Sequence, residues 1–522
     1  MLRPLYNHQL LIQELHWVNE MKNAVTYDQL PAFSSVEIID ELRMLRIDQS
    51  ILAEGEIRNV GEITQSIHGL LQFFSKKKDL YPSLSSRLTK VKYHPEIIDA
   101  IQKVLDRNGK VKSSASPQLE RIRHSLERTH QQIQRAFNKM LENLYNDGWL
   151  SDTKESFVGG RRVLSVMSEF KRKVDGHVMG MSNTGKITYI EPASTIALNN
   201  ELIILENEER LEINRILLGL CNFLRNYYAD LAIYQETVVA FDLMRAKGRF
   251  AYEINGVLPE LSKDGELYLV QGVHPLLYLR NKEKGNKTLG QTLHLSTDHR
   301  MLVISGPNAG GKTITLKTIG LLQLMLQSGM LVSCKEYSRF CFFDTVLTDI
   351  GDNQSIENEL STYSYRLKQM KHILKTANKK SLVLMDEFGT GSDPELGGAL
   401  AEVFFQELHK KGAYGALTTH YGNIKVQAEN LPGVINGCML FDRETLSPRY
   451  ELAIGQPGSS FTFEVSQKIG LDAKLIQDAK KRVRKDRVQF DQSLAEVQKT
   501  KAEVEQLKKE LFQAKTKSEE RA

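Results

Sequence analysis

The spacing of hydrophobic positions divides the chain into stretches with different predicted secondary structure. Over residues 10 to about 107, apolar residues recur at helical intervals, for example Ile63, Ile67 and Leu70, which predicts a helical core domain over residues 1–116. Ser116 followed by Pro117 is typical of an N-cap and the first helical position, and opens a helix that we expect to reach about residue 144. A second long helix is predicted from about residue 198 to 234. We interpret residues 117–147 and 198–264 as helical lever arms.

A different pattern lies between the two arms and after them. Residues 148–197 combine several glycines with short β-like runs at 163–167 and 187–190, which predicts a small clamp-like β insertion at the tip of the arms. Residues 265–474 alternate short apolar strands with helices, which predicts a mainly parallel sheet covered by helices on both faces. Residues 475–522 are rich in Lys, Glu and Gln. One of the two core positions of a coiled-coil heptad is apolar there, but the other holds mostly polar or small residues. A long charged helix is favoured there over a stable coiled coil.

Composition narrows the class of protein without naming a partner. The 522 residues carry 69 basic and 64 acidic side chains, a net charge of +5, so a nucleic-acid surface would have to be a local patch. The cysteines are scattered without a CxxC pair, which argues against a zinc site or a disulfide framework and favours buried thiols in a reducing compartment; they are Cys221, Cys334, Cys341 and Cys438. No signal peptide and no apolar run of about 18 residues is visible. We expect a cytoplasmic protein that does not enter a membrane.

A glycine-rich loop follows the apolar run at residues 301–305 and precedes a predicted helix. Its residues fit the phosphate-loop pattern and are Gly306, Pro307, Asn308, Ala309, Gly310, Gly311, Lys312 and Thr313. Backbone N–H groups in such a loop face phosphates, Lys312 would neutralise the β and γ phosphates, and Thr313 would bind magnesium. A simple glycine turn before a helix is the alternative. The full pattern in this context favours ATP with Mg²⁺.

Two further strand ends supply candidate catalytic groups. Asp386 ends an apolar run and would hold the magnesium, while Glu387 would orient or deprotonate the attacking water. His420 closes the run at 416–419, where a neutral imidazole could sense the γ phosphate. Taken alone, each of these features has a structural interpretation. Asp386 and Glu387 could be an ordinary acidic pair at a strand end, and His420 could be a structural histidine. The loop at 389–394, with Asp393, either crosses between subunits or forms an Asx turn.

A basic cluster in the predicted β insertion is the candidate nucleic-acid surface. It comprises Arg161, Arg162, Lys171, Arg172 and Lys173. Such a local excess of positive charge can contact phosphates. A solvated hairpin face explains the same charges equally well.

The glycine loop, the stretch Leu384-Met385-Asp386-Glu387-Phe388-Gly389 and Thr418-Thr419-His420-Tyr421 resemble, in order and spacing, the motifs of the MutS ATPase family. Residues 359–363 sit where that family carries its version of the ABC signature. The resemblance implies an α/β ABC-type P-loop ATPase domain, preceded by an α-helical core and lever domain with the β clamp insertion and followed by the long helix. It also implies that Ser361 meets the nucleotide of a partner subunit.

Three other stretches resemble the second, mismatch-independent branch of that family, MutS-two. They are Gly159-Gly160-Arg161, residues 188–192 and Leu198-Asn199-Asn200. This resemblance implies a homodimer that binds branched or structured DNA and suppresses homologous recombination, or that acts on stalled or collided ribosomes through rRNA. It also implies that the chain starts late and stops before the small MutS-related nuclease domain, so endonuclease activity would belong to a longer parent.

The leading interpretation is therefore an ATP-driven homodimeric clamp. A nucleotide-switched DNA-binding module with slow hydrolysis and a mismatch-repair-type MutS damage sensor are the alternatives. An SMC-like repair ATPase ranks low, because an LSGGQ-like signature is missing and the predicted arms are short.

Overall fold

The computed structural model describes residues 2–307, 310–351, 362–389, 394–442, 447–459, 463, 466–467, 469–482 and 500. The chain forms two compact units: residues 31–242 are one, and residues 1–30 with 243–522 are the other. Helix α8 (Tyr228–Glu253) contributes to both units. Within the described ranges, no helix has the length and apolar character needed to cross a membrane.

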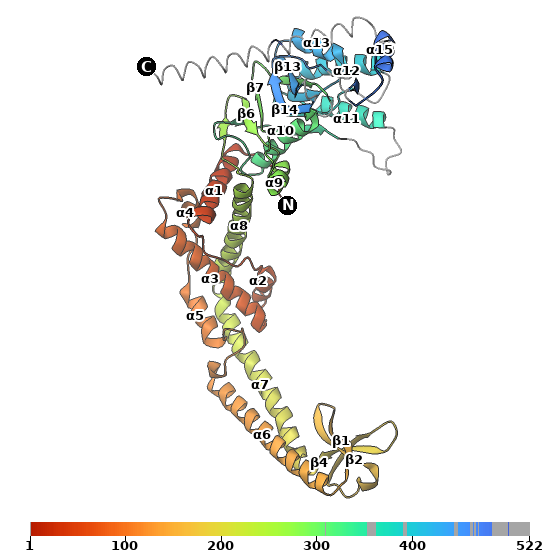
Figure 1. Ribbon diagram of the computed structural model, residues 1–522. Coiled ribbons are helices and arrows are strands. Elements are labelled where there is room, and N and C mark those ends of the chain that lie inside the picture. The colour runs from red at the N-terminus through yellow and green to blue at the C-terminus, as the bar shows by residue number, and fades with distance from the viewer. Residues whose placement is uncertain are drawn as a thin grey trace, which may run out of the picture. The chain divides into compact units, whose positions relative to one another are not determined.

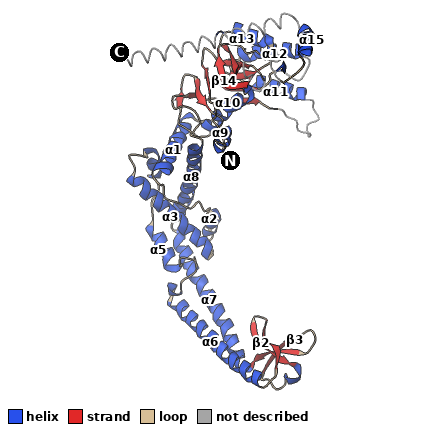
Figure 2. Cartoon of the chain, viewed as in Figure 1, coloured by secondary structure: helices blue, strands red, loops and turns tan. Residues whose placement is uncertain are grey.

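Helices dominate the unit of residues 31–242 (Figures 1 and 2). Its shorter helices are α2 (Ile39–Leu45), α3 (Glu54–Lys76), α4 (Pro82–Leu88) and α5 (Pro95–Val104). The predicted helical stripe is confirmed, because Ile63, Ile67 and Leu70 of α3 are fully buried. The two longest are α6 (Pro117–Asn146) and α7 (Ala193–Arg225), which lie side by side. The predicted start of α6 is also confirmed, because Ser116 Oγ accepts the N–H of Leu119 at 3.0 Å.

The single helix predicted for residues 198–234 is wrong. Two helices, α7 and α8, cover this stretch, and Asn226 and Tyr227 form the turn between them. The N–H groups of these two residues bond to carbonyls three residues earlier, which tightens the end of α7. The Arg225 guanidinium also bonds to the backbone carbonyls of Leu45 and Ile47. The end of α7 is thus bonded to a segment distant in the sequence, and no proline or glycine marks the break in the sequence.

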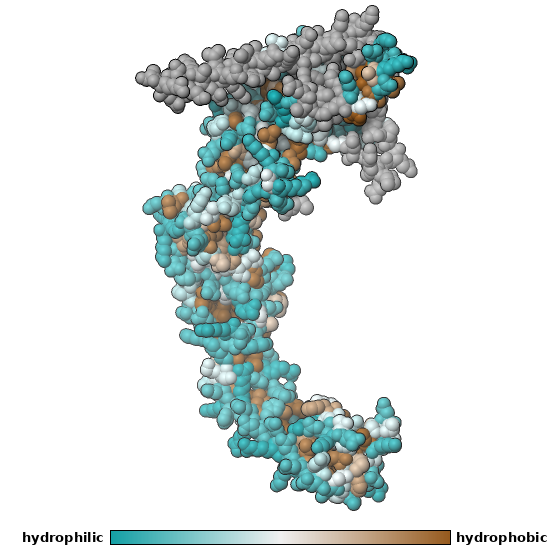
Figure 3. Space-filling view, viewed as in Figure 1, coloured by the Kyte–Doolittle hydropathy of each residue, from teal (hydrophilic) through white to brown (hydrophobic). Residues whose placement is uncertain are grey.

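The predicted β insertion is a four-stranded antiparallel sheet, which we call the β tip. Its strands run in the order β1-β2-β4-β3 and comprise β1 (Leu150–Val158), β2 (Arg161–Met167), β3 (Gly176–Met181) and β4 (Ile187–Pro192). Leu164, Val166 and Ile190 pack against Phe137 and Leu144 of α6. This small core holds the sheet on the end of the α6–α7 pair, where apolar side chains also show among polar ones on the surface (Figure 3).

The other unit is built on a six-stranded sheet with the order β10-β11-β12-β8-β13-β14. Its first five strands are parallel and the last is antiparallel. The strands are β8 (Met301–Ser305), β10 (Thr345–Asp349), β11 (Ser381–Met385), β12 (Tyr414–Thr418), β13 (Val434–Asp442) and β14 (Ser447–Ile454). This confirms the mainly parallel sheet predicted from the alternating pattern.

Helices cover both faces of this sheet, as predicted. Val303 and Val383 point into an apolar core shared with α11 (Thr362–Thr376), α12 (Pro394–Lys410) and α13 (Gly422–Asn430). On the opposite face, Leu384 meets α10 (Lys312–Gln327) so closely that a Cβ on Gly320 would lie 2.7 Å from its side chain. Because adjacent strand residues point to opposite faces, the unbroken apolar strands are those of a sheet buried on both sides.

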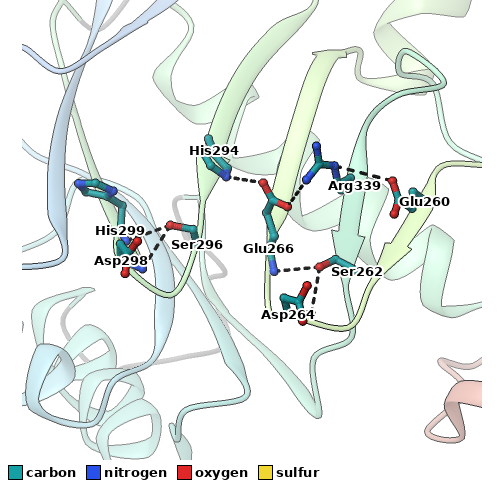
Figure 4. Close-up of polar contacts among 9 residues, drawn as sticks. All are labelled: Glu260, Ser262, Asp264, Glu266, His294, Ser296, Asp298, His299 and Arg339. Atoms are coloured by element: carbon teal, nitrogen blue, oxygen red, sulfur yellow. Dashed lines mark hydrogen bonds and ion pairs between the residues drawn. The ribbon is translucent and has the colours of Figure 1, made fainter.

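A second, four-stranded sheet in this unit has the order β5-β9-β6-β7. Its strands are β5 (Glu260–Ser262), β6 (Leu267–Gly272), β7 (Gln291–Leu295) and β9 (Arg339–Cys341), with α1 (His8–Tyr27) and α9 (Pro275–Glu283) elsewhere in the unit. Figure 4 shows a polar network that ties three of these strands together. Glu266 accepts from Arg339 at 2.6 Å and lies 2.8 Å from His294 Nε2.

The predicted domain bounds are finer than this division into two units, and they stay predictions. The structure does group residues 1–30 with residues 243–522. Of the predicted C-terminal helix at 475–522, helix α15 (Ala473–Arg482) is described, and most of the remainder lies outside the described residues.

Candidate nucleotide site

The glycine loop lies where β8 leads into α10. Gly306 and Gly311 have φ angles of 126° and 98°, and Gly311 is the N-cap of α10. Such angles are strained for residues with a side chain, which explains the glycines at these two positions. The loop therefore presents the N-terminus of a helix, whose free N–H groups and positive dipole end attract anions. Of the predicted loop residues, Asn308 and Ala309 lie outside the described residues.

Lys312 is the buried cation of this loop. Its side chain is 3% exposed, and its Nζ donates to the carbonyl oxygen of Gly306 at 2.6 Å. Burial lowers the pKa of Lys312 to about 8, although the carboxylates of Glu387 and Asp386 act in the opposite direction. An arriving phosphate would favour the charged form of this ammonium.

Asp386 is held by two hydroxyl groups from different elements. Thr313 Oγ1, from the first turn of α10, donates to Asp386 Oδ2 at 2.6 Å. Thr418 Oγ1, at the end of β12, donates to Asp386 Oδ1 at 2.6 Å. The predicted magnesium ligands Thr313 and Asp386 are thus brought together. A hydroxyl and a carboxylate are oxygen donors of the kind Mg²⁺ prefers, so this pair fits that ion.

Glu387 has a backbone conformation that is uncommon for a residue with a side chain. Its φ angle is 47°, in the left-handed region that non-glycine residues rarely enter. Its N–H donates to Thr418 Oγ1 at 2.7 Å, and its carbonyl accepts from Arg366 Nη1 at 3.1 Å. Strained residues of this kind cluster at functional sites. Glu387 also lines a cavity beside Arg366, Asp349 and Leu400.

His420 lies beside the buried lysine, as the sequence suggested. Its Nε2 is 3.5 Å from Lys312 Nζ. Burial, together with the charges of Lys312 and Lys425, lowers the pKa of His420 to about 4. The imidazole is therefore neutral at pH 7, which is the form assumed in the predicted γ-phosphate contact. Ser361 and the loop residue Asp393 lie outside the described residues, so their assigned roles remain predictions.

Sequence reasoning missed several neighbours of the acidic pair. Thr418 received no role of its own, although it joins Asp386 to the backbone of Glu387. Arg366 and Asp349 were not singled out, and burial next to Asp386 raises the pKa of Asp349. Thr418 directly precedes the Thr419-His420 pair, and this hydroxyl-rich strand end was the available signal. The other two residues carry no local signal.

The predicted nucleic-acid residues divide into two groups in the β tip. Arg161 Nη1 contacts both carboxylate oxygens of Glu191, at 3.0 and 2.9 Å, and its Nη2 donates to Asn200 at 2.7 Å. Glu191 is 1% exposed and also accepts from Asn199 at 2.7 Å. Arg161 therefore has a structural task, which is to neutralise a buried carboxylate where β2, β4 and α7 meet.

Arg162 also has partners within the protein. It donates to Glu155 from Nε at 2.9 Å and lies over the Phe137 ring at 4.2 Å. Arg172 and Lys173 are exposed and Lys171 is half-buried. Arg172 and Lys173 are thus the more accessible members of the predicted phosphate-binding cluster, and whether any member binds nucleic acid stays a prediction.

Comparison with known proteins agrees with the motifs. The family model described as MutS domain V matches residues 302–486. The chain is 36% identical over 470 residues to endonuclease MutS2 of Enterococcus faecalis, covering 89% of this chain and 59% of that protein. It is 32% identical over 501 residues to endonuclease MutS2 of Staphylococcus carnosus, covering 95% and 63%. The chain thus spans about 59 to 63% of the length of these relatives. From the motifs, the α/β fold and these similarities, the chain belongs to the MutS family, in the MutS2 branch.

Proposed function

We propose that this chain binds ATP with Mg²⁺ and hydrolyses it, and that it does so as a homodimeric clamp on DNA. The observation that carries the ATPase proposal is the convergence of Lys312, Thr313 and Asp386 at the N-terminus of α10. A buried ammonium, a hydroxyl–carboxylate pair and a helix N-terminus together provide a binding site for a magnesium–phosphate group.

In this proposal, each side chain has a distinct task. Lys312 neutralises the terminal phosphates, and Thr313 and Asp386 hold Mg²⁺, which would supply further neutralisation of phosphate charge when bound. Glu387 orients or deprotonates the attacking water, and neutral His420 contacts the γ phosphate. The strained backbone of Glu387 is held by Thr418 and Arg366, which would fix the direction of its carboxylate.

An apolar stripe beside the site supports the homodimer. Leu396, Leu400 and Val403 follow each other at intervals of four and three residues on α12, and they are 74%, 43% and 57% exposed. Such spacing puts them on one face of the helix. Leu400 also lines the cavity that contains Glu387. A second subunit on this stripe would approach the catalytic carboxylate, and a subunit there is what the proposed role of a partner's Ser361 requires.

A contact at the far end of α10 supports the coupling of nucleotide to a moving arm. Lys247 of α8 donates from Nζ to Ser328 O, just beyond α10, and to Glu14 Oε1 of α1, both at 2.9 Å. Lys247 is 5% exposed. Helix α10 therefore has the phosphate loop at one end and α8 at the other. A shift of α10 on nucleotide binding would therefore displace α8 through the hydrogen bond between Lys247 and Ser328.

For the target, we propose branched or otherwise structured DNA, with suppression of homologous recombination as the cellular role. The proposal rests on the MutS2 relatives and on the exposed cations Arg172 and Lys173 of the β tip. The stalled or collided ribosome is the second candidate target, because cations that contact phosphates can bind DNA and rRNA equally.

A subunit-mixing experiment tests the ATPase and the dimer together. Lys312→Ala and Ser361→Ala proteins should each be inactive, whereas the wild type hydrolyses ATP. After subunit exchange, a heterodimer has one intact site, so an equimolar mixture should recover about a quarter of wild-type turnover if subunits pair at random. A mixture that stays inactive despite demonstrated exchange would exclude a shared site. An inactive wild type would exclude the ATPase itself.

A further inference from the structure

A cavity of about 390 Å³, which we call the lysine cavity, lies at the amino ends of strands β11 and β12. Tyr414, the first residue of β12, lines it, as do Lys379 and Lys380, which directly precede β11. Asp386 and His420 follow the carboxyl ends of the same two strands. Each strand has five residues, so its two ends are about 13 Å apart. The lysine cavity is therefore separate from the candidate nucleotide site.

The lysine cavity has a positively charged lining. Lys263, Lys379 and Lys380 line it, and none of the described lining residues is an aspartate or a glutamate. These lysines have no ion-pair partner among the described residues. Arg300 adds to the charge, because a Cβ placed on Gly412 would lie 3.1 Å from Arg300 Nη1 and 3.3 Å from Lys379 Cγ. Cations that converge in this way repel each other, and a bound anion would relieve the repulsion.

Tyr414 adds a buried hydroxyl to this lining. The residue is 4% exposed, and its ring packs edge-on against Phe343 with 5.5 Å between the centroids. A Cβ placed on Gly265, another lining residue, would lie 2.7 Å from the Tyr414 hydroxyl oxygen, so the hydroxyl lies at the cavity. This hydroxyl has no hydrogen-bond partner among the described residues. Because a buried donor gains from a partner, the hydroxyl is available to a ligand.

Aromatic rings and a fixed loop complete the lysine cavity. Phe342 and His8 both line it, are both half-buried, and meet edge-on with 6.1 Å between the ring centroids. The loop that carries Lys263 is held by Ser262, whose Oγ accepts the N–H groups two and four residues further on, at 3.2 and 3.4 Å (Figure 4). The volume lies within the range of about 300–1,000 Å³ that holds small organic ligands.

We propose that the lysine cavity is a second nucleotide-binding site, which takes a nucleoside diphosphate without a metal ion. The lysines and the Tyr414 hydroxyl contact the phosphates, and the rings of Phe342 and His8 flank the base. Stacking on such rings is open to any base, since every base has a π face. The described lining offers Mg²⁺ no carboxylate ligand, in contrast to the site around Asp386. This proposal goes beyond the ATP binding proposed above and does not depend on it.

Equilibrium dialysis with labelled ADP separates the two sites by their need for magnesium. With Mg²⁺, the wild type should bind ADP at both sites, and in EDTA at the lysine cavity alone. The double variant Lys379→Ala with Lys380→Ala should lose the EDTA-resistant binding and keep the magnesium-dependent binding. Lys312→Ala should show the reverse. The matched control is Lys371→Ala with Lys375→Ala, two exposed lysines of α11 that do not line the cavity.

Tyr414→Phe tests the buried hydroxyl separately from the fold. The substitution removes a hydroxyl without a partner, so thermal stability in the absence of nucleotide should be unchanged or higher. Affinity for ADP in EDTA should fall about 10- to 150-fold, the range for a lost hydrogen bond to a charged group.

Three results would overturn the proposal. The first is a wild type that binds ADP with Mg²⁺ and not in EDTA. The second is EDTA-resistant binding that survives both Tyr414→Phe and the double lysine variant. The third is equal affinity for ADP and pyrophosphate in EDTA, which would exclude a contact with the base. Loss of the magnesium-dependent binding alone would instead contradict the proposed function and leave the second site standing.

Discussion

The nucleotide site and the β tip both contain buried charged groups, but they use them differently. In the β tip, Arg161 pairs with Glu191, a carboxylate that is 1% exposed. In the nucleotide site, Lys312 is 3% exposed, and its ammonium faces the carbonyl of Gly306 and the neutral imidazole of His420. The partly exposed cation Arg161 neutralises a buried carboxylate within the protein, whereas burial lowers the pKa of the cation Lys312 itself.

This difference bears on which cations can bind a ligand. A lysine with a depressed pKa gains from an anion that arrives, because the anion restores the stability of its charged form. An arginine that neutralises a buried carboxylate would have to leave that carboxylate uncompensated, which is costly. Arg161 and Lys312 both look like phosphate-binding residues in the sequence. Their surroundings favour such a role for Lys312 and a structural role for Arg161.

The largest expected effect in this comparison is on the β tip. Arg161→Met should leave Glu191 buried without its guanidinium and destabilise the tip by about 3 kcal/mol, the lower end for a broken buried pair because Arg161 is 23% exposed. Hydrogen exchange of the β2 and β4 amides should then accelerate by about two orders of magnitude. The nucleotide site should be unaffected.

Two variants sharpen the assignment of Arg161. Arg172→Met removes an exposed cation of the same sheet region and should leave the exchange rates unchanged. The double variant Arg161→Met with Glu191→Leu removes both charges and should recover much of the lost protection, because an apolar pair can replace a buried ion pair. If Arg161→Met alone exchanges like the wild type, the pair does not stabilise the tip.

The sequence was sufficient to predict those features whose residues lie close together along the chain. The spacing of Gly306, Lys312 and Thr313 needs a strand before it and a helix after it, and hydrophobic periodicity supplied both. The helix start at Ser116-Pro117 and the mainly parallel sheet followed from the same kind of local rule. Side chains within one turn or one strand have few alternatives, so a pattern can identify them.

Where distant residues meet, local patterns were insufficient. The break at Asn226 lies beside Arg225, which bonds to the end of α2 and the residues after it, and the sequence around the break has a continuously helical pattern. Thr418 and Arg366 act on Glu387 only because neighbouring strands and a helix bring them there. The pairing of Arg161 with Glu191 spans 30 positions, so a count of basic residues could not separate it from exposed Arg172.

A smaller expected effect concerns pH and the nucleotide site. The pKa of Lys312 is about 8, and we expect phosphate to raise it, so the protonated form is the one that binds. Affinity for ATP should be constant below pH 8 and fall as pH rises above it, by about tenfold or more at pH 9.5. Titrations at several pH values would measure this. Lys312→Arg, which stays charged, should show no such fall; a wild-type profile that is flat to pH 9.5 would contradict the role of Lys312.

The smallest expected effect tests whether the remaining cations of the β tip serve a ligand. Reversing Lys171, Arg172 and Lys173 to Glu should weaken branched-DNA binding several-fold and flatten its salt dependence, by up to about 0.9 in the log–log slope per lost phosphate contact. The matched control reverses Lys76, Lys77 and Lys78 at the end of α3 in the same unit, with the same change in net charge. If both variants lose DNA affinity equally, the cations of the β tip are a solvated face and do not bind the DNA. A loss of ribosome co-sedimentation with intact DNA binding would make rRNA the target, and the exposed cations of the tip would then bind phosphates of RNA while Arg161 keeps its structural task.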